Sequence, residues 1–352
     1  MLYCYPLDAI ADNWVHISLV QIVRSIHEAV EAGHASPTWP ELIPDEFRDR
    51  LRSRRKLRDK LLSYAKALTA LDQNDRAKVI EALDAQNNVA ALLSRDADCS
   101  DVKALPATMR GEIREVFEVG FELLTDLFTR DAHYVKVYNE IPSRICPFCG
   151  SEFFDAPGRL REALDHYLAE SLYPFAGANL RNLVPMGVKC NSGYKKAKDI
   201  LHKETGERRR AIDPYAGEPL TISLRGSLPL GVAGDNKPFW NISIIGDAEH
   251  AETWNAVFKI KERFEKDVLG PELRAWLNSF ASWCRSANVE VMTDAGLTET
   301  LRLYRDHLRR CGLDDRCFLR VEVFEILLAD CENGLGRTIT IMRSLANLHV
   351  KT

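Results

Sequence analysis

The sequence of 352 residues lacks several features that would define its class at once. It contains no uncharged run of about eighteen apolar residues, which excludes a membrane-spanning helix. Its first residues include no basic region and reach Asp8 and Asp12 early, so we expect no signal peptide. Internal repeats and low-complexity tracts are also missing. Together with 46% hydrophobic and 28% charged residues, these absences predict a globular cytoplasmic protein.

Neither sign of charge dominates the chain. The 47 Lys and Arg residues face 51 Asp and Glu residues, for a net charge of −4. This balance excludes a uniformly basic coat for nucleic acid but leaves room for local basic patches. The nine cysteines are odd in number and widely scattered, which argues against a disulfide framework. Only Cys146 and Cys149 have a spacing that indicates chemistry.

Apolar residues recur with a helical period over most of the chain. This period predicts one helix over residues 14–31 and another that begins near residue 46. Further helices are predicted over about 75–94, 109–130, 252–284, 298–311 and 316–331. Residues 134–138 alternate weakly like a short strand, and 220–225 and 239–245 also have strand patterns. We therefore predict an α+β fold that is mainly helical. Its expected parts are a helical region for partner or DNA contacts (1–133), a compact metal module (134–219), and short strands with further helices (220–352).

Cys146 and Cys149 form a C-x-x-C motif that Gly150 closes. Two thiolates at this spacing can converge on one ion, and Zn²⁺ prefers such soft ligands in a tetrahedral arrangement. A chance pair and a redox pair are the alternatives. A redox pair normally precedes a helix in a thioredoxin-like context, which the pattern here lacks.

Asp165 and His166 are adjacent, so in a strand their side chains point to opposite faces unless the strand ends or bends there. At a strand end the carboxylate can hold a cation while the imidazole takes a proton from a nearby water. The side-chain oxygens of Asn182 and Asn191 are neutral hard donors that suit Mg²⁺ or Mn²⁺. Each residue alone also has a common structural use: capping or turn formation for asparagine, and a solvated surface for the Asp-His pair.

Together these spacings resemble the HNH endonuclease family, whose ββα-metal fold carries the pattern C-x-x-C…D-H…N-L…C-x-x-C-N…K. The match covers residues 144–199, about a sixth of the chain. It rests on C-x-x-C at 146–149, Leu-Asp-His-Tyr-Leu at 164–168, Asn-Leu-Val-Pro at 182–185 and Cys-Asn-Ser at 190–192. One position departs from the pattern, because Gly187 stands where the family has a cysteine.

The resemblance implies a role for each matching residue. His166 would be the general base that deprotonates a water for attack on a DNA phosphodiester. Asp165 and Asn191 would hold one Mg²⁺ or Mn²⁺ ion, and Asn182 would orient His166 by a hydrogen bond. The implied structural zinc would have three ligands, Cys146, Cys149 and Cys190. Either a residue from elsewhere supplies the fourth, with His202 nearest in sequence, or the replacement by Gly187 has weakened or abolished zinc binding. The implied contacts to DNA are Lys189, Lys195, Lys196 and Lys198.

Two basic runs add local positive charge. Residues 189–210 contain eight basic and three acidic residues, which suits phosphate binding beside the expected site. Residues 48–60 contain eight basic and two acidic residues, and these form either a solvated helix face, a DNA-guiding arm or a contact to an acidic partner.

Two classes of function remain in competition. The first is a DNA endonuclease. By analogy of size and layout, such a chain is similar to the nuclease effectors of bacterial antiphage systems, which implies an ATPase subunit as a partner. The second is a zinc-knuckle protein without activity that binds nucleic acid or acts as a scaffold, in which Asp165 and His166 are merely structural.

Overall fold

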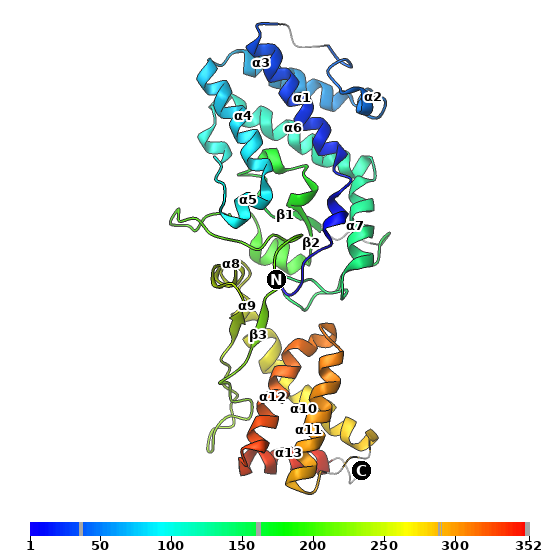
Figure 1. Ribbon diagram of the computed structural model, residues 1–352, viewed down its shortest axis with the longest axis vertical. Coiled ribbons are helices and arrows are strands. Elements are labelled where there is room, and N and C mark those ends of the chain that lie inside the picture. The colour runs from blue at the N-terminus through cyan, green and yellow to red at the C-terminus, as the bar shows by residue number, and fades with distance from the viewer. Residues whose placement is uncertain (35–37, 160–162, 288, 290, 349–352) are drawn as a thin grey trace. The chain divides into compact units, whose positions relative to one another are not determined.

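The computed structural model describes residues 1–34, 38–159, 163–287, 289 and 291–348 (Figure 1). The chain divides into two compact units. The first contains residues 1, 3–148 and 152–218, and the second contains residues 2, 149–151 and 219–352. The helices of residues 1–133 and most of the central segment to Glu218 therefore belong to the first unit. Among the described residues, no helix combines the length and apolar character that crossing a bilayer requires.

The helices of the first unit follow the apolar stripes of the sequence. In α1, six apolar residues of the predicted stripe, from Val15 to Val30, are buried. The predicted helix over 75–94 is broken at Asn88, and the one over 109–130 ends where Phe128 adopts a left-handed conformation. The helices are α1 (Trp14–Glu31), α2 (Asp45–Leu51), α3 (Arg55–Thr69), α4 (Gln73–Asn87), α5 (Val89–Ser94), α6 (Ala107–Asp126) and α7 (Thr129–Glu140).

The strand predicted over residues 134–138 is wrong, because these residues lie within the helix α7. The alternation is only five residues long, whereas Thr129, His133 and Val137 bury one face at a spacing of four. A spacing of four is a helical period, and burial of that face decides the conformation.

The central segment of the first unit packs against the surface of helix α6. This helix packs against α1, α3 and the short 3-10 helix η3 (Pro174–Ala176). Phe117 of α6 meets Phe175 of η3 edge to face, with ring centroids 5.3 Å apart. Gly120 permits a close approach, since a Cβ there would lie 2.3 Å from Leu19 Cδ1. The loop that follows β1 (Ala163–His166) is thereby fixed to the helical core.

The remaining short elements of the first unit connect these parts. β1 pairs with β2 (Leu183–Met186) in a two-stranded antiparallel sheet in the middle of the first unit (Figure 1). A π-helical segment, η5 (Lys189–Lys195), follows β2 directly. The other 3-10 helices are η1 (Leu7–Ile10), η2 (Val102–Ala104) and η4 (Leu180–Asn182).

The second unit combines a small sheet with helices. Its strands β3 (Thr221–Ser223) and β4 (Ser243–Ile245) pair antiparallel inside the predicted stretches 220–225 and 239–245. The helix predicted over 252–284 is interrupted at Lys259, which is left-handed. The helical elements are α8 (Ala248–Phe258), α9 (Ile260–Arg263), the π-helical η6 (Phe264–Leu269), α10 (Gly270–Ala287), α11 (Asp294–Arg310), η7 (Asp314–Arg316), α12 (Cys317–Glu332) and α13 (Gly336–Leu348).

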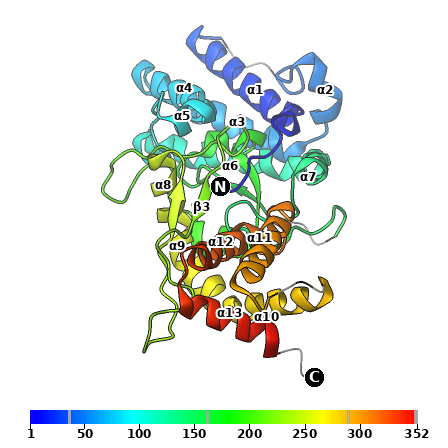
Figure 2. The ribbon, with the colours of Figure 1, turned by 60° about the horizontal axis from the view of Figure 1, so that its bottom comes forward.

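Aromatic side chains form much of the core of the second unit. Phe280, Tyr304 and Phe324 have ring centroids 4.8–5.6 Å apart. They lie where α10, α11, α12 and α13 pack side by side (Figure 2). The other aromatic residues buried in this unit include Trp254, Phe258, Phe264 and Trp276.

Buried histidines of the first unit make its stability depend on pH. Burial lowers the pKa of His16 and of His27 to about 4, and it also lowers the pKa of His133. In the unfolded chain these imidazoles take up protons below about pH 6.5. The unfolded state therefore binds more protons between pH 6.5 and 4, so acid favours unfolding. Each of the first two groups contributes about 3 kcal/mol of this loss by pH 4.

We expect the urea midpoint to fall steadily between pH 7 and pH 5. His16→Gln removes one of these groups, so its midpoint should change less with pH than that of the wild type. Urea titrations followed by circular dichroism at pH 7, 6 and 5 measure both slopes. Equal slopes for the two proteins would contradict the assignment of His16 as a buried neutral imidazole.

Candidate active site and cysteine cluster

The candidate site is built on a strand pair and the helical segment that follows it. Asp165 lies opposite Val184 and His166 opposite Leu183 in the β1–β2 register. Since successive side chains of a strand point to opposite faces, Asp165 and His166 face different surroundings. Along the chain, the strand that carries Asp165 and His166 is followed by β2 and then by the helical segment that carries Asn191.

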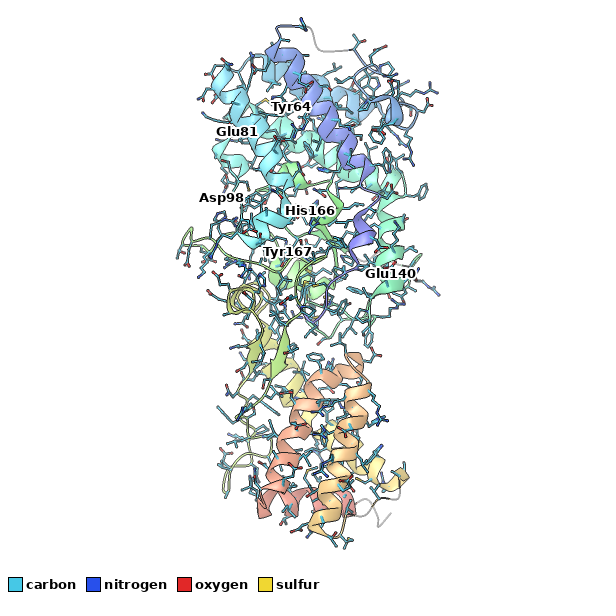
Figure 3. All side chains as sticks on the ribbon, in the orientation of Figure 1. Tyr64, Glu81, Asp98, Glu140, His166 and Tyr167 are labelled. Atoms are coloured by element: carbon cyan, nitrogen blue, oxygen red, sulfur yellow. The ribbon has the colours of Figure 1, made fainter. Side chains whose placement is uncertain are left out.

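His166 is held in one tautomer. Its side chain is 14% exposed, and its ring packs on Phe121 of α6 with centroids 4.6 Å apart (Figure 3 labels His166). Its Nε2 atom is 2.8 Å from the carbonyl oxygen of Gly177. A carbonyl oxygen only accepts, so the proton resides on Nε2 and Nδ1 keeps its lone pair. Nδ1 lies 3.6 Å from a carboxylate oxygen of Glu170.

The surroundings of His166 keep it uncharged. Burial is the main cause that lowers its pKa to about 4, and the charges of Lys195 and Arg130 act in the same direction. Burial together with the charge of Glu118 raises the pKa of Glu170 to about 7. At neutral pH the imidazole is therefore a neutral base whose free nitrogen faces an acid that titrates near neutrality.

Asn182 holds the loop rather than the histidine. Its Oδ1 accepts from the backbone N–H of Leu168 at 2.6 Å, and its Nδ2 donates to the carbonyls of Leu168 and Ala176 at 3.1 and 3.2 Å. The expected direct bond to His166 is not among the contacts of the described residues, because loop backbone uses both ends of the carboxamide. Ala176, one of the residues that Asn182 holds, is followed by Gly177, whose carbonyl accepts from His166. Asn182 therefore positions the imidazole indirectly.

Asp165 has a buried partner that the sequence analysis did not assign to it. Lys195 Nζ lies 2.9 Å from Asp165 Oδ2 and 2.6 Å from the carbonyl oxygen of His166. Lys195 is only 1% exposed, so its expected role as a surface contact to DNA is wrong. Burial raises the pKa of Asp165, and the Lys195 ammonium opposes this rise.

Asp165 and Asn191 offer oxygen ligands that a hard divalent cation accepts, but the charge of Lys195 opposes its binding. Asn191 precedes Lys195 by four residues in η5, so both lie on about the same face of the helical segment, and Lys195 shows that this face is turned toward Asp165. A carboxylate and a carboxamide are appropriate ligands for Mg²⁺ or Mn²⁺. The Lys195 ammonium already neutralises the carboxylate, however, so the pair offers a cation little net charge.

Three cysteines lie together beside this strand pair. The sulfur atoms of Cys146, Cys149 and Cys190 are buried and lie within 4.8 Å of one another. The backbone N–H of Gly187 donates to Cys146 Sγ at 3.4 Å. Thiolates at this spacing, with an N–H group directed at one of them, fit a zinc ion. The convergence that the motif predicts for the three cysteines is therefore present.

His202 does not complete this cluster. Its Nδ1 lies 2.9 Å from Asp199 Oδ2 and 3.2 Å from the hydroxyl of Tyr173, and it is not among the described residues grouped with the cysteines. The nearest histidine in sequence is thus committed to another polar cluster. A tetrahedral zinc site at this cluster would need its fourth ligand from a different residue.

The basic side chains of residues 189–210 are less exposed to solvent than the composition of this run indicates. Lys189, Lys196 and Lys198 are exposed, in agreement with a surface role. Lys195 is buried, and Arg208 bonds the carbonyls of Leu92, Ala97 and Leu201. Part of the expected phosphate-binding charge therefore serves the fold.

The run at 48–60 is largely paired within the chain. Arg54 lies 3.6 Å from Asp126 and Lys60 2.8 Å from Glu115, and Lys56 pairs with Glu122. Three further pairs, Arg48–Asp45, Arg52–Asp49 and Arg58–Asp59, lie within the run or next to it. These pairs favour the solvated helix face among the alternatives.

Searches of family models, curated proteins and solved structures found no match to this chain. The HNH resemblance stays a prediction that rests on the motif residues.

The ion pair between Lys195 and Asp165 generates a stability prediction. Lys195→Met leaves a buried carboxylate without its cation, which we expect to cost about 3–5 kcal/mol of unfolding free energy. Lys189→Met is the matched control, because Lys189 is exposed and should change stability by less than about 0.5 kcal/mol. Denaturant titrations measure both, and equal losses would contradict the pairing. Adding Asp165→Asn to Lys195→Met should recover part of the loss, because it removes the orphaned charge.

Proposed function

We propose that this chain is a metal-dependent endonuclease of the HNH type that hydrolyses DNA phosphodiester bonds. The observation that carries the proposal is the state of His166. A buried neutral imidazole with its proton fixed on Nε2 presents Nδ1 as a base, and it does so at the end of a strand that also carries Asp165.

In this proposal His166 Nδ1 accepts the proton of the attacking water. The Nε2–H bond to Gly177 then stabilises the imidazolium, and the Glu170 carboxylate beside Nδ1 does the same. An approaching phosphodiester adds negative charge, which raises the pKa of the imidazole toward the range in which it is an effective base. Positioned base catalysis of this kind contributes about 10²–10⁴-fold.

Asp165 and Asn191 would hold Mg²⁺ or Mn²⁺ beside the scissile phosphate. Such an ion, when bound, neutralises charge on the phosphate and on the leaving oxygen. Because Lys195 already compensates Asp165, this chain would bind the ion weakly without DNA. The phosphate itself would then supply the missing negative charge, and the exposed Lys189, Lys196 and Lys198 would guide the backbone.

A second function has one observation in its favour. The Lys195 ammonium provides a stable partner for Asp165 with no metal at all. A zinc-knuckle protein that binds nucleic acid or acts as a scaffold would retain this ion pair and need no cleavage.

The test is a plasmid-nicking assay. We expect nicking with Mg²⁺ or Mn²⁺ that EDTA stops, and a loss of at least about 100-fold in His166→Ala, because the base is removed. His34→Ala is the control, since His34 is exposed and distant in sequence from the motif. Nicking by His166→Ala at the wild-type rate would contradict the assignment. DNA binding without metal-dependent nicking by the wild type would support the second function.

We also propose that the nuclease works as an effector with an ATPase subunit in bacterial antiphage defence. This part rests on the family analogy alone. It predicts that the tagged chain co-purifies with an ATPase from its host and that two purified proteins reconstitute the complex. Robust plasmid cutting by the isolated chain, with no such complex, would argue against it.

A further inference from the structure

The cysteine cluster lacks a fourth ligand in the sequence pattern, and a glutamate side chain lies beside the position where the pattern expects it. Structural Zn²⁺ is almost always four-coordinate. The pattern would put a fourth thiolate at residue 187, but this residue is glycine. Its backbone N–H donates to Cys146 Sγ at 3.4 Å, so residue 187 does lie against the cluster.

The space for a side chain at residue 187 is filled by Glu152. A Cβ on Gly187 would lie 2.6 Å from Glu152 Oε2 and 2.7 Å from its Cδ. A carboxylate therefore occupies the volume in which the missing cysteine would begin. This close approach gives a physical reason for glycine at a position where any larger residue would collide with Glu152.

The backbone directs Glu152 to the same side as Cys146. Ile145 and Phe153 form an antiparallel bridge, and the N–H of Cys146 bonds the carbonyl of Glu152 at 2.8 Å. Cys146 and Glu152 are therefore opposite each other across the knuckle, and side chains opposite each other in an antiparallel pair share one face. Glu152 Oε1 accepts from the backbone N–H of Lys189 at 2.9 Å, so one oxygen is anchored and Oε2 faces residue 187.

We propose that Cys146, Cys149, Cys190 and Glu152 form a Cys₃Glu zinc site in which the Glu152 carboxylate replaces the fourth cysteine. Carboxylate oxygens are established zinc ligands with a bond length of about 2.0–2.2 Å. The three sulfur atoms lie within 4.8 Å of one another, but the Glu152 carboxylate is not part of this group. Ligation therefore requires the carboxylate to turn toward the sulfurs. The inference does not depend on nuclease activity.

The first experiment measures metal binding by the full-length protein. We expect one zinc per chain in the wild type. In Glu152→Gln we expect an affinity at least about 10-fold lower by chelator competition. The amide oxygen of glutamine can still accept from Lys189 N–H, so this variant keeps the backbone contact and loses the anionic ligand. Glu140→Gln, on an exposed residue of α7, is the matched control and should bind zinc as the wild type does.

The second experiment counts thiolates with Co²⁺ in place of zinc. The wild type should show the charge-transfer absorption of three thiolates in a tetrahedral site. The double variant Glu152→Ala/Gly187→Cys removes the obstructing carboxylate and restores a fourth cysteine, so its charge-transfer absorption should rise in the ratio of four thiolates to three. Gly187→Cys alone should not show this rise, because the new side chain meets Glu152.

Either of two results would overturn the proposal. One is a wild-type protein that binds no zinc. The other is a Glu152→Gln variant with the zinc affinity and cobalt spectrum of the wild type, which would assign the fourth position to another donor. If Glu152→Gln does not fold, X-ray absorption of the zinc-loaded wild type decides instead: a shell of three sulfurs and one oxygen supports the proposal, and four sulfurs or three sulfurs alone contradict it.

Discussion

The pairing of two strands of four residues each, β1 and β2, sets the directions of Asp165 and His166, on which the candidate site depends. Their pairing puts Asp165 and His166 on opposite faces, so the carboxylate meets η5 while the imidazole meets α6. A two-stranded sheet of this length is marginal by itself. It persists here because Asn182 ties the connecting loop to backbone and because Phe175 of that loop packs on α6. The helical core is thus the support on which a small polar site is held.

Charge around the strand pair is balanced without any ion. Lys195 is buried against Asp165, and Glu170 has a pKa close to neutrality beside a neutral His166. Such balance lowers the cost of burying polar groups, which is high for an unpaired charge. In the proposed function, a divalent cation and the anionic backbone of DNA would bind better together than separately, since each supplies the charge that the other lacks. The groups that stabilise the fold would then also set the conditions for the proposed catalysis.

The sequence patterns correctly predicted the features that depend on interactions between residues close together in the chain. The stripe of α1 and the convergence of Cys146 with Cys149 depend on residues a few positions apart, and both were predictable. The mistaken strand at 134–138 shows the limit, since its alternation was outweighed by burial of Thr129, His133 and Val137 against distant parts of the chain.

Contacts between distant segments were beyond sequence reasoning. Lys195 was taken for a surface lysine because nothing in its neighbourhood indicates burial, and its partner lies thirty residues earlier in the chain. Glu170 is a local exception: it lies only four residues after His166, but it is outside the motif, so nothing marked it as a partner. Glu152 meets Gly187 across the knuckle, a contact that no spacing rule connects. The sequence contained one indication of this contact: Gly187 is a small residue at a position where the pattern predicts a metal ligand.

The cysteine cluster and the candidate active site share one continuous piece of backbone. Gly187 directly follows β2, and Cys190 lies inside η5 together with Asn191 and Lys195. The N–H bond from Gly187 to Cys146 and the Lys189 bond to Glu152 hold both ends of this turn. Any ion that draws the three sulfurs together would therefore also fix the start of the helical segment that reaches Asp165. A zinc ion at the knuckle would act on the polar site through this backbone alone, without contact to the reacting groups.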